Sequence, residues 1–251
     1  AQIITKNGPE AVVVRIRNIS TTSFDIRVQE EQGNNSSHVG EEVAWIAMEP
    51  GSQTTNFRYE AGITATSVTQ NWFTINFAQT YSANRVFLPM MNTQAGGDPA
   101  GSRYQSLGAG SAQVKAEEET SSDTEVAHAA EAFGYAVFDA PGDLYNEDGD
   151  DIGELGSVTT DHTWHTVNLR NGYNDPVVVM GAASFNDSDP VTIRVQNVTY
   201  NGFEFQMDEW DYQDGTHGTE TISYIVVEGS TIEDMTVACD SIPVPPAIGA
   251  T

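Results

Sequence analysis

A short pattern occurs three times in this chain at nearly equal spacing, and it constrains the fold more than any other feature. Each copy reads His-x-x-Glu-x-x-x-aromatic, and the copies begin at His38, His128 and His217, 90 and 89 residues apart. Each copy continues into a short apolar segment that ends at an acidic residue and a turn. Equal spacing of one punctuated segment indicates a tandem repeat. A period near 90 residues is too long for a solenoid unit and suits a small β-sandwich.

The composition is typical of an all-β chain. Residues that favour strands are frequent, and no stretch of ten or more residues has the 3.6-residue periodicity of an amphipathic helix. The 251 residues correspond to two whole repeats and a fraction. We therefore predict tandem antiparallel β-sandwich modules with an incomplete first module. The boundaries are the C-terminal half of a module over residues 1–51, whole modules over 52–142 and 143–230, and an extended tail over 231–251.

Residue patterns within the modules predict their cores. Phe203 to Met207 alternates strictly between apolar and polar residues, which indicates a sheet with one buried face. Each whole module also has a tryptophan nine residues before a tyrosine. We expect these aromatic residues to be core anchors, because buried aromatics dominate small cores. They are Trp72 with Tyr81 and Trp164 with Tyr173.

The sequence predicts an incomplete module at the N-terminal end of the chain and a strand without a module of its own at the C-terminal end. Residues 12–20 align with residues 191–199, so the first module lacks its opening strands and is expected to have unpaired strand edges. The tail begins like the first strand of a further module and continues into a Pro-rich segment that cannot lie inside a sheet. We therefore expect the tail to act as a donor strand. Its candidate donor residues are Ile232, Met235, Val237 and Cys239.

The net charge excludes several classes of partner. The chain has 36 acidic residues against 10 Lys and Arg, a formal net charge of −26. A polyanion of this kind is not expected to bind nucleic acid or an anionic membrane without a cation bridge. No apolar run is long enough to span a bilayer, no signal peptide is present, and the first residue is not Met, which suggests a processed or excised piece. The single cysteine, Cys239, excludes an internal disulfide framework.

The segment between the whole modules is rich in oxygen ligands. It offers enough carboxylates and amides for Ca²⁺, the only cofactor that the sequence suggests. Leu144 takes a place where an EF-hand needs a ligand, so a solvated acidic linker is the alternative interpretation. The candidate ligands are Asp143, Asn146, Asp148, Asp150 and Glu154.

Neither the histidines nor the acidic pairs predict catalysis. Positions i and i+3 of a strand point to opposite faces, so His38 and Glu41 are not expected to converge on a metal ion, and a structural histidine is favoured. Acidic pairs recur in every repeat, whereas a glycosidase needs two carboxylates at a fixed separation in one cleft. No Ser/His/Asp order, Gly-rich phosphate loop or Cys-based metal spacing is present. We predict that the protein is not an enzyme.

Several short motifs of the third module resemble the H-type lectin module. They are a Val-rich strand after Pro176, the strand around Arg194, Asn201-Gly202-Phe203, Trp210 and the closing Ser223-Tyr224-Ile225. The segment Val43-Ala44-Trp45-Ile46-Ala47 is still more similar to that family's closing strand. The resemblance implies a six-stranded antiparallel sandwich, trimeric assembly in the lectin members and binding of N-acetylgalactosamine-like sugars.

The resemblance also implies candidate carbohydrate-binding residues. An Arg and a Trp-His pair help to form the sugar site of those lectins, and here Arg194 and Trp210 match while Asp211 replaces the histidine. Glu31 and Glu119 take the tryptophan position in the other modules, which removes the stacking face for a sugar ring. Arg194, Trp210 and Asp211 are therefore the candidate site, and the fold transfers more readily than the activity.

Two functions follow as hypotheses. In the first, the chain is a non-catalytic extracellular or cell-surface structural and adhesive protein, a fibre subunit that polymerises head-to-tail by strand donation from the tail into the first module. Its partners are then identical subunits, in an oligomer or a filament. In the second, the modules bind glycans as part of a larger polysaccharide-acting or adhesive protein. Neither hypothesis involves nucleic acid or direct membrane insertion.

Overall fold

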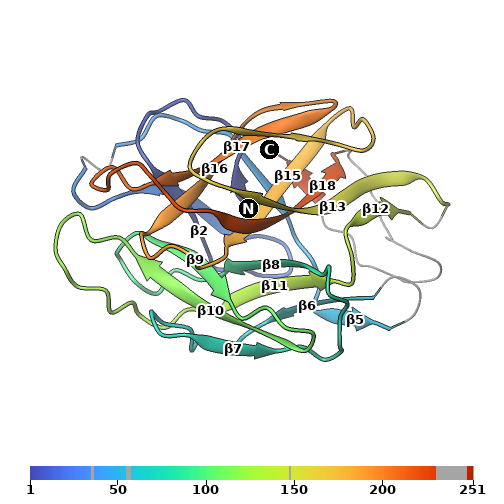
Figure 1. Ribbon diagram of the computed structural model, residues 1–251, viewed down its shortest axis with the longest axis horizontal. Helices are drawn as coiled ribbons and strands as arrows, with labels where there is room; N and C mark the ends of the chain where they lie inside the picture. Colours follow the sequence, from blue (N-terminus) through green and yellow to red (C-terminus); the bar gives the residue numbers. More distant parts are fainter. Residues whose placement is uncertain (35–36, 55–57, 147, 230–247, 251) are drawn as a thin grey trace.

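The structure is a computed structural model that describes residues 1–34, 37–54, 58–146, 148–229 and 248–250 (Figure 1). Within these ranges every regular element is a β-strand, and almost all strand pairs are antiparallel, which confirms the predicted all-β class. The described residues contain no helix that could cross a membrane. We refer to residues 1–51, 52–142 and 143–229 as repeats 1, 2 and 3.

Repeats 2 and 3 have the same arrangement of six strands in two groups of three. In repeat 2 the first group pairs in the order β6-β11-β8 and the second in the order β7-β10-β9; repeat 3 has β13-β18-β15 and β14-β17-β16. Figure 1 shows repeat 2 in the lower half of the molecule and repeat 3 in the upper half. The strands of repeat 2 are β6 (Tyr59–Ile63), β7 (Phe73–Asn76), β8 (Val86–Met91), β9 (Ala100–Gln105), β10 (Ser111–Glu118) and β11 (Phe133–Phe138). Those of repeat 3 are β13 (Asp151–Thr160), β14 (His165–Asn168), β15 (Pro176–Ala183), β16 (Val191–Thr199), β17 (Gly202–Glu209) and β18 (Glu220–Glu228).

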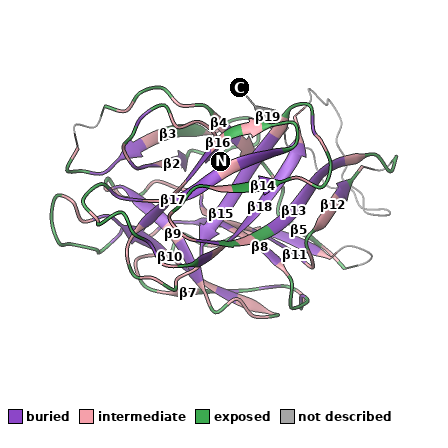
Figure 2. Cartoon of the chain, turned by 45° about the horizontal axis from the view of Figure 1, so that its top comes forward, coloured by how far each residue is buried: buried purple, intermediate pink, exposed green. Residues whose placement is uncertain are grey.

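Repeat 1 contains counterparts of the later strands of this unit. Its strands are β1 (Gln2–Ile3), β2 (Val12–Arg17), β3 (Asp25–Glu30) and β4 (Val43–Ile46). β2 pairs with β3 as β16 pairs with β17, and β1 pairs with β4 as β15 pairs with β18. The other side of β4 is taken by β19 (Ile248–Ala250), from the far end of the chain (Figure 2). β19 thus lies where β13 lies on β18.

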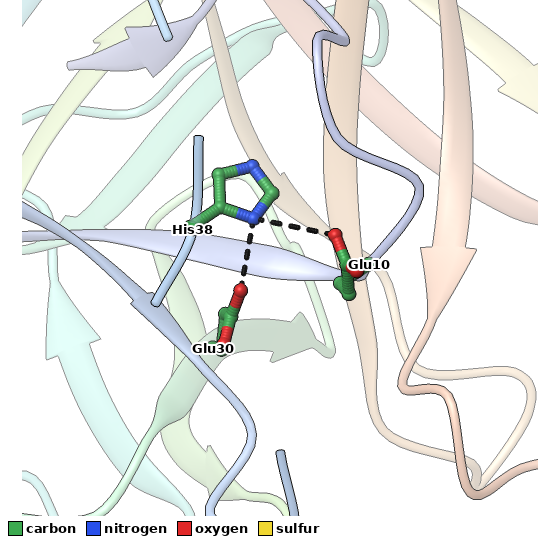
Figure 3. A group of neighbouring side chains, drawn as sticks. All are labelled: Glu10, Glu30 and His38. Carbon is green, nitrogen blue, oxygen red and sulfur yellow. Dashed lines mark hydrogen bonds and ion pairs between the residues drawn. The ribbon is translucent and has the colours of Figure 1, made fainter. Parts of the chain in front are cut away.

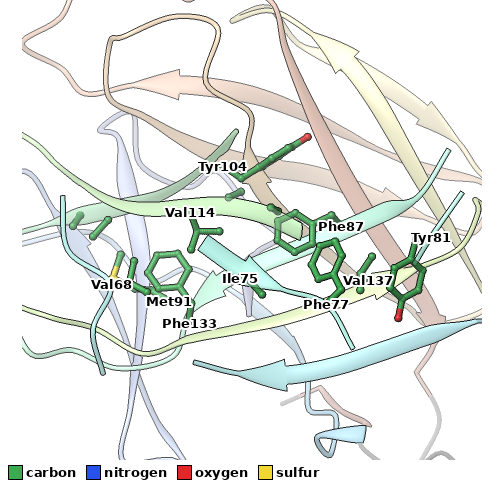
Figure 4. Close-up of a cluster of buried hydrophobic side chains, with 14 residues drawn as sticks. Val68, Ile75, Phe77, Tyr81, Phe87, Met91, Tyr104, Val114, Phe133 and Val137 are labelled. Carbon is green, nitrogen blue, oxygen red and sulfur yellow. The ribbon is translucent and has the colours of Figure 1, made fainter. Parts of the chain in front are cut away.

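Two separate cores lie between the paired sheets of repeats 2 and 3. In repeat 2, Phe87 and Val137 of the first sheet pack with Ile75 and Val114 of the second (Figure 4). In repeat 3 the alternating residues Phe203, Phe205 and Met207 of β17 are buried in the equivalent core, as their period predicted. The two tyrosine anchors are buried as expected, but Trp164 is 36% exposed and Trp72 is half-buried, so the tryptophans are not core anchors.

A third core joins the three repeats. Ala44 of repeat 1, Val86 of repeat 2 and Val179 and Ile225 of repeat 3 belong to it. β15 contributes to two cores, because Val177 and Val179 face this shared core while alternate residues face the core of repeat 3. This explains why β15 and β18 are buried along almost their whole length (Figure 2).

The acidic segment between repeats 2 and 3, for which a calcium site or a solvated linker was expected, forms a hairpin. β12 (Gly142–Tyr145) pairs with β13, and Asn146 exchanges backbone hydrogen bonds with Gly149 and Asp150 where the two strands meet. There Gly149 has a φ of +84°, a left-handed conformation that glycine adopts without strain. A short strand, β5 (Gly51–Gln53), similarly pairs with β6 at the start of repeat 2.

Candidate functional site

The three His-x-x-Glu patterns form three similar polar clusters. His38 to Glu41 precedes β4 in a loop, so the alternation of a strand does not apply and both side chains point toward each other. The strand geometry assumed for His38 and Glu41 was therefore wrong. His38 Nε2 lies 2.9 Å from Glu41 Oε1, and His128 Nε2 lies 3.1 Å from Glu131 Oε1. In the third copy His217 Nε2 is 3.5 Å from Glu220 Oε1.

The other ring nitrogen of each histidine faces a second glutamate, the last residue of a strand of the same repeat. The distances from Nδ1 to that carboxylate are 3.1 Å in the first copy and 3.2 Å in the other two. Each histidine therefore lies between two buried carboxylates; His38 and His128 hydrogen-bond both, and His217 hydrogen-bonds the second one, which confirms that the histidines are hydrogen-bonded. The second glutamates are Glu30, Glu118 and Glu209.

An arginine from a different repeat completes each cluster. Arg15 of repeat 1 lies 2.8 Å from Glu131 of repeat 2, Arg103 of repeat 2 lies 2.8 Å from Glu220 of repeat 3, and Arg194 of repeat 3 lies 2.9 Å from Glu41 of repeat 1. All six of these side chains are 0% exposed. The three ion pairs run from repeat 1 to 2, from 2 to 3 and from 3 back to 1. They form a closed ring of interfaces.

The glutamates of the ring are held by further hydrogen bonds. In each cluster a hydroxyl of Thr or Ser donates to Oε2 of the glutamate that pairs with the arginine. A backbone N–H group two residues after that Thr or Ser donates to the same carboxylate. Buried charges need such partners, because an unpaired one costs several kcal/mol. The hydroxyls come from Thr5, Thr93 and Ser184.

These contacts shift the pKa values of the clusters in opposite directions. Burial alone would raise the pKa of Glu131, but hydrogen bonds from His128, Thr93 and Ala95 together with the charge of Arg15 lower it to about 2. The pKa of Glu220 is lowered to about 2 in the same way. Burial would lower the pKa of His128, whereas its hydrogen bonds to two glutamates raise it above 6.5. The charged forms of Glu131 and Glu220, and the charged forms of His128 and His217, are thus favoured.

Two of the three residues proposed for sugar binding are buried. Trp210 is 1% exposed, and Arg194 is 0% exposed in its ion pair with Glu41. Asp211 is exposed and accepts hydrogen bonds from Ala11 N and Asn34 Nδ2. In this arrangement neither the tryptophan ring nor the guanidinium is presented to a ligand from solvent.

The residues proposed for calcium binding are distributed over the β12–β13 hairpin. Asp143 contacts Arg170, while Asn146 and Asp150 hydrogen-bond each other across the turn and Asp148 is exposed. Glu154 is fully buried and accepts hydrogen bonds from Arg170 N and Tyr224 Oη. Among the described residues, the groups of three close ligand atoms occur elsewhere.

The proposed donor residues Ile232, Met235, Val237 and Cys239 lie outside the described residues. The part of the tail that pairs with repeat 1 is Ile248–Ala250. The ring of ion pairs was not predicted from the sequence either. A signal was present, because Arg15, Arg103 and Arg194 recur at spacings of 88 and 91 residues, close to those of the histidines.

No protein-family model matches the chain, and no solved structure matches it. Over 223 residues, 86% of the chain, the sequence is 24% identical to halomucin of Haloquadratum walsbyi. The chain spans about 2% of the length of this curated relative.

Proposed function

We propose that this chain is a non-catalytic structural part of an extracellular or cell-surface protein and that copies of it are linked by strand addition to β4. The similarity to part of halomucin and the net charge of −26 support a structural role outside the cell. A high net charge keeps a protein soluble and separate from other polyanions. The ring of buried ion pairs supports a scaffold role, because it joins the repeats and leaves their charged groups paired with one another.

The observation that carries the strand-addition proposal is the register of β19. Gly249 pairs opposite Trp45, as Gly62 pairs opposite Tyr135 and Gly156 opposite Tyr224. A glycine opposite an aromatic residue thus recurs at the same place in all three repeats. β19 accordingly takes the place that a first strand takes in repeats 2 and 3.

The same contact can form within one chain or between two chains. An edge strand presents unpaired N–H and C=O groups that any strand of suitable register can satisfy. Exchange of an identical element between copies costs little, because the contacts are unchanged, and exchange that does not close produces filaments. β19 of one copy bound to β4 of the next would link the copies head to tail.

The test compares the whole chain with Gly249→Val. A Cβ added at the equivalent Gly62 or Gly156 would lie 2.6 or 2.3 Å from the ring of the opposite tyrosine, so valine at position 249 is expected to weaken this pairing. We expect the unaltered chain to form oligomers or filaments that grow with concentration, seen by light scattering and negative-stain imaging, and the variant to form fewer. Gly110→Val is the matched control, since a Cβ there meets nothing within 4 Å.

Hydrogen exchange separates specific linkage from aggregation. Backbone amides of β4 should be protected in the unaltered chain and in the control, and should exchange faster in Gly249→Val. A chain that stays monomeric at every concentration would show that β19 pairs within its own chain, and the linkage proposal would then be wrong.

A further inference from the structure

The His38 cluster, in repeat 1, has an additional carboxylate beside its histidine (Figure 3). Glu30 Oε1 lies 3.1 Å from His38 Nδ1, and Glu10 Oε2 lies 3.7 Å from the same nitrogen. The three side chains come from different segments: the end of β3, the loop before β2 and the loop before β4. One ligand atom from each lies within 4.8 Å of the other two.

These distances suit ligands that share one metal ion. Nitrogen and carboxylate oxygen atoms bind Zn²⁺ at about 2.0–2.2 Å. Two ligand atoms that bind the same ion at an angle of about 90° or 109° are then about 3.0–3.5 Å from each other. Glu30 and His38 already have this separation, and Glu10, whose side chain is 37% exposed, can approach by a small rotation.

The surroundings of His38 resemble those of a metal-binding histidine whose ring is oriented by a hydrogen bond from its other nitrogen. Its Nε2 lies 2.9 Å from Glu41 Oε1, which can accept the proton of that nitrogen and leave the Nδ1 lone pair directed at Glu10 and Glu30. Metal-binding histidines almost always donate their other N–H to a carboxylate or carbonyl in this way. Glu41 is itself held by Arg194 and Thr5.

Two buried oxygen atoms at this site have no hydrogen-bond partner within the described residues. Glu30 is 6% exposed, and its Oε2 is buried with no hydrogen-bond partner. The adjacent Gln29 Oε1 is also buried without a partner. Glu30, His38, Gln29 and Gln32 line a cavity of about 230 Å³. Leaving a buried carboxylate oxygen without a partner is unfavourable, and a bound cation would offset this cost.

We propose that Glu10, Glu30 and His38 bind a divalent transition-metal ion of the Zn²⁺ class. A nitrogen ligand with two carboxylates suits such ions, whereas Ca²⁺ and Mg²⁺ prefer oxygen ligands alone. The corresponding acids of repeat 2, Asp98 and Glu118, form a close group with Glu125, and although His128 Nδ1 lies 3.2 Å from Glu118, the histidine is not a member of that group. The site therefore belongs to repeat 1, and it does not depend on linkage between copies.

The test is titration of the chelator-treated whole chain with ZnCl₂ by calorimetry and with CoCl₂ by visible absorption. We expect one saturable site at the His38 cluster. The visible spectrum of bound Co²⁺ should indicate coordination by a nitrogen atom, and CaCl₂ should not compete with Zn²⁺. Glu10→Gln should weaken Zn²⁺ binding by roughly tenfold or more, the range seen when groups of a metal site are removed. Glu125→Gln, which makes the same charge change in the group with Asp98 and Glu118, should leave the affinity unchanged.

The variant Glu10→Gln keeps the test independent of folding. The Glu10 side chain is partly exposed and lies outside the ring of interface ion pairs, so the metal-free variant should unfold at the same temperature as the unaltered chain. Absence of Zn²⁺ and Co²⁺ binding, or equal affinity in the unaltered chain and Glu10→Gln, would overturn the proposal.

Discussion

At the scale of single residues, Arg103 shows how the repeats are joined. Its side chain is 0% exposed, and it contacts the carboxylates of Glu117 and Glu220 at 2.8 Å each. It also donates to the backbone carbonyls of Ser184, Asp187 and Asp189 in repeat 3. One guanidinium of repeat 2 thus satisfies a loop and a buried carboxylate of repeat 3. The planar fork of arginine can make this set of bonds, and lysine cannot.

We predict that Arg103→Met lowers the free energy of unfolding by roughly 3–5 kcal/mol, because it removes the guanidinium partner of the buried carboxylates of Glu117 and Glu220. Urea unfolding followed by circular dichroism measures the change. Arg58→Met is the control: Arg58 is 42% exposed at 3.7 Å from Asp139, and loss of such a surface pair costs about 0–1 kcal/mol. Equal losses in the two variants would contradict a special role for the ring.

At the scale of strands, a glycine opposite an aromatic residue organises the first sheet of each repeat. Gly156 of β13 pairs with Tyr224 of β18, and a Cβ at Gly156 would lie 2.3 Å from the tyrosine ring. The ring lies over the glycine, and its hydroxyl donates to buried Glu154 on the neighbouring strand. Any side chain at position 156 must displace the ring and break that bond.

We therefore expect Gly156→Ala to reduce the free energy of unfolding by about 1–3 kcal/mol, the usual cost of inserting an extra methyl group into a packed site. The measurement is thermal or urea unfolding, with Gly110→Ala as the control because its Cβ would meet nothing within 4 Å. A stabilised Gly156→Ala would mean that the ring does not occupy this place in solution.

At the scale of the whole molecule, the ring of clusters makes stability depend on pH in both directions. The pKa values of Glu131 and Glu220 are lowered from 4.5 to about 2. Their contribution to the free energy of unfolding is therefore fully present above pH 4.5 and is lost as the pH falls toward 2. His128 and His217 have pKa values raised above 6.5, so their contribution is present below 6.5 and is lost as the pH rises through the raised values. Maximum stability is predicted between about 4.5 and 6.5.

Urea unfolding at a series of pH values tests this prediction. The free energy of unfolding should fall on both sides of the window, and the variant His128→Gln should show a weaker decrease on the alkaline side. Stability that increases steadily above pH 8 would show that the histidines are not charged in the folded protein.

The sequence by itself determined the strand content, the repeat and the buried face of strands such as β17, because these depend on local periodicity and on the spacing of matched residues. It also predicted that the histidines are hydrogen-bonded. It did not predict the hairpin at 142–160, where the turn chemistry of Asn146 and Gly149 outweighs the acidic composition.

Only the tertiary structure decided which residues meet across the repeats. Arg194 and Glu41 are 153 positions apart, and β19 and β4 about 200, and no local pattern specifies such pairs. Tertiary packing also buried Trp210, which sequence analysis placed in a sugar site, and it exposed Trp164, which was expected in the core. The burial of a side chain depends on which surfaces the repeats present to one another, and in this chain the closed ring of three repeats sets that arrangement.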